Sequence, residues 1–258
     1  MRIYRNTRVV FFVSLMTALI MQDILATAAL AQDLGTISRL EGTAQVQRGG
    51  NTIQAALSMA VRLHDRITTG KNTYLTISML GGSAMTLSSN SVLTIDESAN
   101  IGGAEAPRRV GLLAGGLHTL ISGAMRSSSN IAFEVHTPNA VGAVRGTEWD
   151  EQYEQGTPRL PQYKDCVEYT EVWVEDGVVH VTNPAVPGDP GQDVTKGHYV
   201  IVACDHPPIA ATAAAGAGPG MRAFMAAGLI APAAGIAAGV AAATSGGGGG
   251  QKPSSPTF

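Results

Sequence analysis

The chain has 258 residues, of which 45% are hydrophobic, 5% aromatic and 14% charged, and its formal net charge is −3. This mild acidity without a basic cluster argues against nucleic-acid binding, because proteins that bind nucleic acid gather lysine and arginine against the phosphates. The small share of aromatic residues and the 31 glycines suit short, tightly turning strands with small side chains inside. Composition therefore favours an all-β protein.

The N-terminus has the three parts of a secretory signal peptide. Three arginines lie within the first eight residues, an apolar run follows over residues 9–21, and Ala29 and Ala31 form an A-x-A cleavage signal. This layout predicts that residues 1–31 are removed on export. An uncleaved N-terminal anchor is the alternative, although the apolar run is short for a membrane helix.

Short strands separated by turns fill residues 33–206. Leu75, Ile77 and Met79 alternate with polar neighbours, a Gly-Gly pair at 81–82 indicates a hairpin, and the alternation resumes before the next strand at 92–95. Turn signals recur about every eight to twelve residues, as in a sandwich, roll or solenoid. We expect an all-β domain that is a compact roll, β-helix-like, or a sandwich of short strands.

Two segments read as exposed loops, and partners often bind such loops on a rigid β scaffold. Residues 102–109 carry charge and a proline, and residues 155–165 are punctuated by two prolines and a tyrosine. Between them, Gly115-Gly116 predicts a turn before the strand at 117–120.

Catalytic chemistry has little support in the sequence. The histidines are scattered singly at 64, 118, 136, 180, 198 and 206, and the H-E-x-x-H, G-x-S-x-G and S-x-x-K motifs are missing. Glu171 and Glu175 share one side of a strand, which a solvated face explains more simply than the facing carboxylates of a glycosidase. We therefore expect no catalytic residue, no cofactor and no metal.

The most informative run is T-P-N-A-V-G-A-V-R-G-T-E-W at residues 137–149. Its alternating apolar positions predict a strand, and Arg145-Gly146 interrupts it. A buried Arg145 would need an acidic partner, and candidates are Glu148, Glu171 and Asp176. Trp149 and Trp173 are expected in the core or half-buried on strands.

This run resembles the signature of the FecR domain family, T-P-x-A-x-x-x-V-R-G-T-x-[FW]. Segments at 64–70, 75–87, 91–95, 172–181 and 194–200 resemble the family's other elements in the family's order, so the likeness covers about residues 35–202. The residues that carry the signature, with an expected structural role, are Thr137, Pro138, Val144, Arg145, Gly146, Thr147 and Trp149.

The resemblance implies a periplasmic all-β domain. FecR regulators relay a signal from an outer-membrane receptor to a cytoplasmic sigma factor through a cytoplasmic segment and one membrane helix. The predicted signal peptide departs from that plan, so we expect a non-enzymatic periplasmic interaction or signal-relay module without the anti-sigma segment. The alternative is a structural envelope protein that binds peptidoglycan or another polysaccharide.

Cys166 and Cys204 are the only cysteines, and in an exported protein such a pair predicts a disulfide. A metal site that adds His198 and His206 is the alternative. The spacing of Cys204 and His206 is too tight for a zinc knuckle, and Cys166 has no nearby partner.

Residues 207–245 are rich in alanine and glycine and carry no charge over 223–245. The segment predicts a C-terminal helix of marginal hydrophobicity, able to contact or span the inner membrane. A soluble or surface-packed helix and a disordered segment are the alternatives. Residues 246–258, with five glycines in a row, are expected to be a flexible tail.

Overall fold

The computed structural model describes residues 33–101, 103–122, 133–144, 146–158, 160 and 162–211. The predicted signal peptide, Arg145, the Ala/Gly-rich segment beyond 211 and the tail at 246–258 lie outside the described residues. Seventeen strands and one short 3-10 turn, η1 (Leu80–Gly82), make up the described elements, so the all-β prediction is confirmed. No helix among these elements has the length and apolar character needed to cross a membrane.

The strands form two sheets. In spatial order the first sheet holds β4 (Ala60–Arg62), β1 (Asp33–Glu41), β6 (Tyr74–Ser78), β7 (Ala84–Leu87), β9 (Ala104–Leu120), β12 (Glu148–Gln155), β13 (Glu168–Asp176), β16 (Tyr199–Ala203) and β17 (Ile209–Ala211). In spatial order the second sheet holds β3 (Asn51–Gln54), β2 (Ala44–Arg48), β5 (Arg66–Thr69), β8 (Val92–Ile101), β9, β10 (Phe133–His136), β11 (Val141–Val144), β14 (Val178–Thr182) and β15 (Gln192–Thr195). All pairs are antiparallel except β9 with β10.

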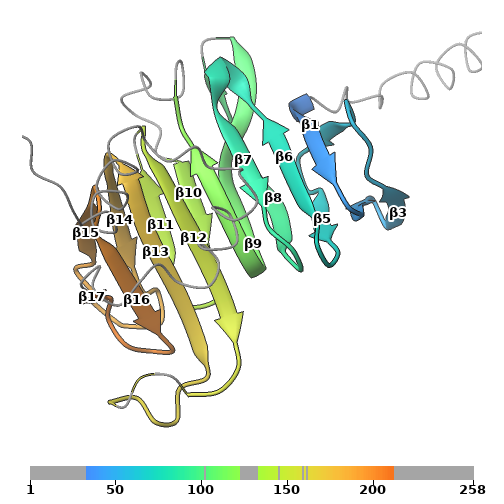
Figure 1. The fold of residues 1–258 in the computed structure, drawn as a ribbon. Coiled ribbons are helices and arrows are strands. Elements are labelled where there is room, and N and C mark those ends of the chain that lie inside the picture. The colour runs from blue at the N-terminus through green and yellow to red at the C-terminus, as the bar shows by residue number, and fades with distance from the viewer. Residues whose placement is uncertain are drawn as a thin grey trace, which may run out of the picture.

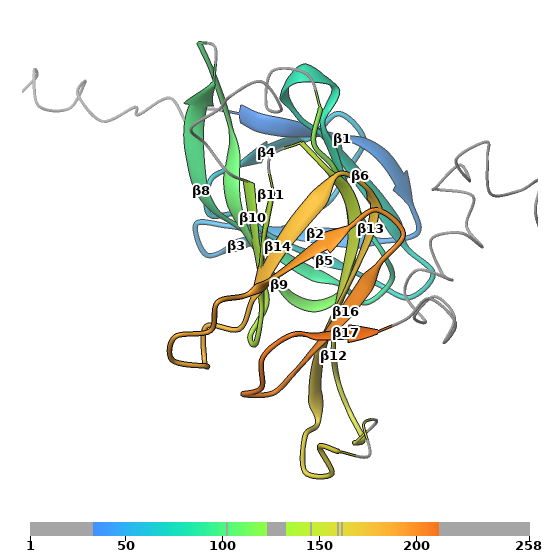
Figure 2. The same cartoon turned by 90° about the vertical axis from the view of Figure 1, so that its left-hand side faces the viewer.

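The chain alternates between the two sheets as it advances. Single strands or hairpins enter one sheet and then the other, so sequence order follows the order along the molecule, as Figure 1 shows from blue to orange, except that β4 and β3 lie outside β1 and β2 at the first end. Figure 2, turned by 90°, shows the layers on either side of the interior. The architecture is thus a two-sheet roll. Ile209–Ala211 is strand β17, so the helix predicted from residue 207 does not begin there.

Strand β9 joins the sheets. Its first part, up to Ala114, pairs with β8, and its last part, from Leu117, pairs with β7. Gly115 lies where the strand changes sheets, with φ of +77°, and a Cβ there would lie 2.3 Å from Ser91 Oγ. The turn predicted at Gly115-Gly116 is therefore a bend within one strand.

The exposed loop predicted at residues 102–109 is wrong. Residues 103–109 lie in the β8–β9 hairpin, and β9 begins at Ala104. Ala106 is fully buried, and Arg108 and Arg109 are half-buried and pair with Glu97. Strand pairing outweighed the local turn composition, because tertiary context decides such short segments.

The core lies between the sheets. Alternating side chains of the strands fill it, and the largest that are fully buried include Ile37, Ile67, Leu75, Ile77, Met85, Leu87, Leu93, Ile95, Leu112 and Trp149. The Trp149 ring meets Phe133 of the second sheet edge to face, with ring centroids 6.0 Å apart. Trp173 is half-buried on the opposite face of the first sheet.

Candidate functional site

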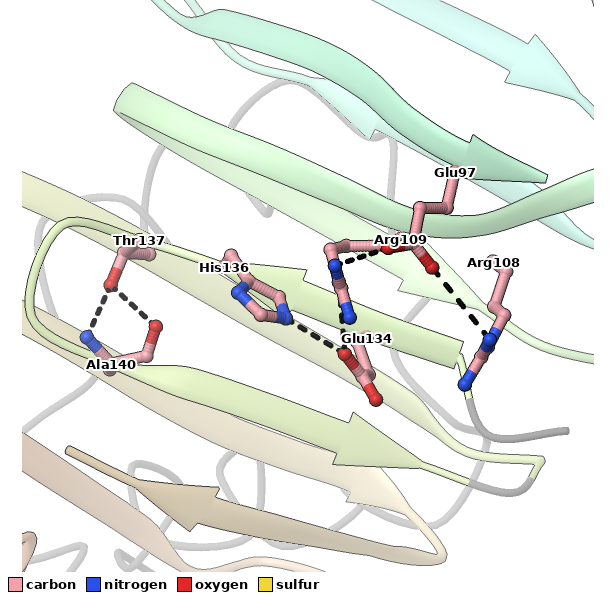
Figure 3. A network of polar contacts seen from close by, with 7 residues as sticks. All are labelled: Glu97, Arg108, Arg109, Glu134, His136, Thr137 and Ala140. Carbon is pink, nitrogen blue, oxygen red and sulfur yellow. Dashed lines mark hydrogen bonds and ion pairs between the residues drawn. The ribbon is translucent and has the colours of Figure 1, made fainter. Parts of the chain in front are cut away.

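The first half of the signature is a buried turn that joins β10 to β11. The Thr137 backbone N–H donates to the Ala140 carbonyl at 2.9 Å, and the Ala140 N–H donates to Thr137 Oγ1 at 2.9 Å. Figure 3 shows this contact at the end of the hairpin. The side-chain hydroxyl thus completes the turn.

Asn139 extends this turn across the core. Its Oδ1 accepts a hydrogen bond of 2.6 Å from the Thr170 hydroxyl, and its Nδ2 donates to the Val202 carbonyl at 3.1 Å. Thr137 and Thr170 hydroxyls also lie 2.7 Å apart. The turn of the second sheet is therefore fastened to β13 and β16 of the first. Sequence analysis missed Asn139, because it occupies a variable position of the motif.

The second half of the signature fixes the crossing from β11 to β12. Gly146 has φ of +85°, and the Thr147 hydroxyl donates to the Val178 carbonyl at 3.0 Å. Gly177, with φ of +89°, packs against Thr147, where a Cβ would lie 2.9 Å from its hydroxyl oxygen. Because Arg145 lies outside the described residues, its ion pair stays a prediction.

Glu151 points from β12 into the core. Its side chain is 1% exposed, Trp149 Nε1 donates to its Oε2 at 3.3 Å, and its Oε1 has no hydrogen-bond partner among the described residues. A Cβ at Gly142 of the facing sheet would lie 2.9 Å from that Oε2, so the glycine makes room for the carboxyl. Burial raises the pKa of Glu151 to about 8, opposed by the Trp149 hydrogen bond.

Acidic side chains surround His118 on the outer face of the first sheet. His118 of β9 stands directly opposite Asp150 of β12, and its Nδ1 lies 3.2 Å from Asp150 Oδ1. Its Nε2 lies 3.5 Å from Glu148 Oε1. Burial lowers the pKa of His118, but hydrogen bonds to Asp150 and Glu148 outweigh it and raise the pKa to about 10. His118 is therefore a hydrogen-bonded residue of the fold and is largely shielded from solvent.

Glu175 joins the same group through a β-bulge. The partners of Glu148 and Trp149 on β13 are Asp176 and Val174, so Glu175 is the extra residue between them. Burial, with the charge of Asp150, raises the pKa of Glu175 to about 7. The solvated face predicted for Glu171 and Glu175 is wrong, since Glu171 is only 9% exposed and Glu175 is half-buried.

A second charged network lies on the outer face of the second sheet. Arg109 pairs with Glu97, and its Nε lies 3.2 Å from Glu134 Oε2, which also lies 2.8 Å from His136 Nε2 (Figure 3). Burial raises the pKa of Glu134, but the His136 and Arg109 hydrogen bonds lower it overall. The network bridges β8, β9 and β10 and is partly open to solvent.

The predicted Cys166–Cys204 disulfide is confirmed, with Cα atoms 5.8 Å apart. It ties the β13 end of the β12–β13 connection to the residue after β16, and the Gly156 N–H donates to the Val167 carbonyl at 2.9 Å across the two ends of the connection. Because both sulfurs are in the disulfide, the metal site considered with His198 and His206 is excluded. Among the described residues of 155–165, the loop prediction is confirmed apart from Gln155, which ends β12.

Tyr163 of this connection packs against His206, with ring centroids 3.9 Å apart and ring planes tilted by 52°. A cavity of about 290 Å³ lies beside them, lined by residues 162–166 and 204–206. In both ribbon views the connection extends past the ends of the sheets. We name the described residues of this connection, 156–158, 160 and 162–167, the stapled loop.

Three comparisons with known proteins bear on the fold and family. A family model described as "FecR protein" matches residues 65–180. Curated protein sequences give no match. Two crystal structures of a candidate anti-sigma factor from Parabacteroides distasonis, at 2.50 and 1.65 Å resolution, are similar with 15% and 14% identity and TM-scores of 0.41 and 0.40. In both cases 57% of this chain is covered, and the chain spans 59% of the length of the other.

Proposed function

We propose, from the match of a FecR family model to residues 65–180, that the protein is a non-enzymatic periplasmic module that binds a protein partner and relays a signal. The signature supports a binding scaffold, because the side chains of Thr137, Asn139 and Thr147 form hydrogen bonds that stabilise the fold. The predicted signal peptide supports export to the periplasm.

The stapled loop is the partner surface that we propose, and the attachment of its ends is the observation that carries the proposal. The disulfide and a backbone hydrogen bond hold its ends, and Tyr163 packs against His206. A loop ordered before binding loses less conformational entropy in a complex. Val167, which is 43% exposed, adds apolar surface beside charged Lys164 and Asp165.

Site-specific photocrosslinking in cells tests this surface. A photoreactive residue at Lys164 should give a discrete crosslinked protein, whereas one at Leu57, which is 61% exposed near β3, should not. Equal products at both positions, or none at Lys164, would contradict the proposed surface.

The polysaccharide alternative predicts a different result. Purified peptidoglycan should leave the protein in the supernatant after centrifugation if the partner is a protein. Sedimentation with the cell wall that does not depend on the stapled loop would replace the signalling proposal by a structural one.

Export and membrane contact are tested separately. Mass spectrometry of the mature protein should find an N-terminus near Gln32, and a chain beginning at Met1 in the cytosol would refute export.

Osmotic shock should release a version truncated after Pro208, and retention of the full chain alone would support membrane contact through 223–245.

A further inference from the structure

His118, Asp150 and Glu175 have the arrangement of a cation site on the outer face of the first sheet. Each offers one ligand atom, and these atoms all lie within 4.8 Å of one another. They come from three neighbouring strands, β9, β12 and β13, which pair continuously at this point. The backbone that carries the ligands is therefore already fixed.

Asp150 supplies an independent indication that a ligand belongs here. The residue is 5% exposed, and although its Oδ1 meets His118, its Oδ2 is buried without a hydrogen-bond partner among the described residues. Buried carboxylate oxygens are normally paired, because leaving one unpaired costs free energy. A cation beside Oδ2 would satisfy it.

The local charge also favours a cation. Glu148, Asp150 and Glu175 supply three carboxyl groups around one imidazole, and Glu175 is the extra residue of the β-bulge. Bulges commonly redirect a side chain toward a site.

We propose that His118, Asp150 and Glu175 bind one divalent transition-metal ion, with Glu148 beside them. One imidazole nitrogen with carboxylate oxygens suits Zn²⁺ and Mn²⁺, whereas Ca²⁺ and Mg²⁺ prefer oxygen ligands alone. Both cysteines are held in the disulfide and do not compete for the metal. A metal here would clamp β9 to β12 and β13.

Isothermal titration of the chelator-treated, dialysed protein with ZnCl₂ and then MnCl₂ tests the proposal. We expect one equivalent of Zn²⁺ to bind, and we expect Asp150→Asn and His118→Ala to weaken binding at least tenfold. Glu175→Gln, at a half-buried position, should weaken it while leaving the far-UV circular dichroism unchanged. That variant decides the question if the buried substitutions do not fold.

His180→Ala is the matched control, because His180 and Asp193 form an exposed pair with 2.7 Å between Nδ1 and Oδ1. Its Zn²⁺ titration should equal that of the native protein. Absence of stoichiometric binding, equal binding by Glu175→Gln, or an equal loss in His180→Ala would overturn the site.

Discussion

Glu151→Gln should remove a pH dependence from the free energy of unfolding. The pKa of Glu151 is about 8 in the folded protein because of burial, against an ordinary value of 4.5. The folded state therefore keeps a proton that the unfolded state releases between these two pH values. This stabilising contribution is fully present below about pH 4.5 and is lost as pH rises through about 8.

The size of the effect follows from linkage. Between pH 5 and 7 the native protein should lose about 2–3 kcal/mol through this group, since each pH unit is worth about 1.4 kcal/mol. A glutamine side chain at this position would keep the size and an oxygen for Trp149 Nε1 but could not ionise. The variant should thus gain about 2–3 kcal/mol relative to native between pH 5 and 7.

Urea unfolding at pH 5, 6, 7 and 8, followed by fluorescence of the two tryptophans, measures this difference directly. Glu154→Gln is the matched control, because it makes the same chemical change on the outer face of the same strand. The control should not reproduce the trend. A constant difference between Glu151→Gln and native across this pH range would show that Glu151 is ionised in the core and would refute the reasoning.

Three further predictions concern contacts between the sheets and the disulfide. Gly142→Ala should destabilise the fold by about 1–3 kcal/mol in urea unfolding, because its Cβ would overlap Glu151 Oε2, whereas Gly156→Ala has open space and should not. Asn139→Ala should cost about 2–3 kcal/mol by leaving the Val202 carbonyl and its other partners unpaired, and an unchanged midpoint would contradict the role of this network. Serine at both positions 166 and 204 should cost about 4 kcal/mol on the chain-entropy model for a separation of 38 residues, and reduction of the native protein should match it.

Local pattern was enough to predict much of the fold. The alternation around Leu75 and Ile77 set the buried face of β6, and the isolated cysteines indicated the disulfide. Both predictions use information that is local: a short stretch of sequence for the buried face of β6, and the predicted export of the protein for the disulfide. The all-β class followed from the same local evidence.

The His118 group could not be found in this way. His118, Asp150 and Glu175 are far apart in sequence, and only the register of three strands brings them together. Glu175 is the unpaired residue of a bulge between the partners of Glu148 and Trp149, a feature that local alternation does not reveal. The exposed-loop prediction for residues 102–109 was wrong for a related reason. Charged side chains of the β8–β9 hairpin pair across strands on the outer face, and the local sequence does not show this pairing.

The position of β9 has a consequence for folding cooperativity. Every described strand before it lies on one side and every described strand after it on the other, in both sheets. Neighbour-to-neighbour coupling along the molecule must therefore pass through this strand, as in a linear array of units. A substitution that weakens β9, such as one at the Gly115 bend, should let the two halves melt separately, and native-state hydrogen exchange would then report two unfolding free energies where the intact protein has one.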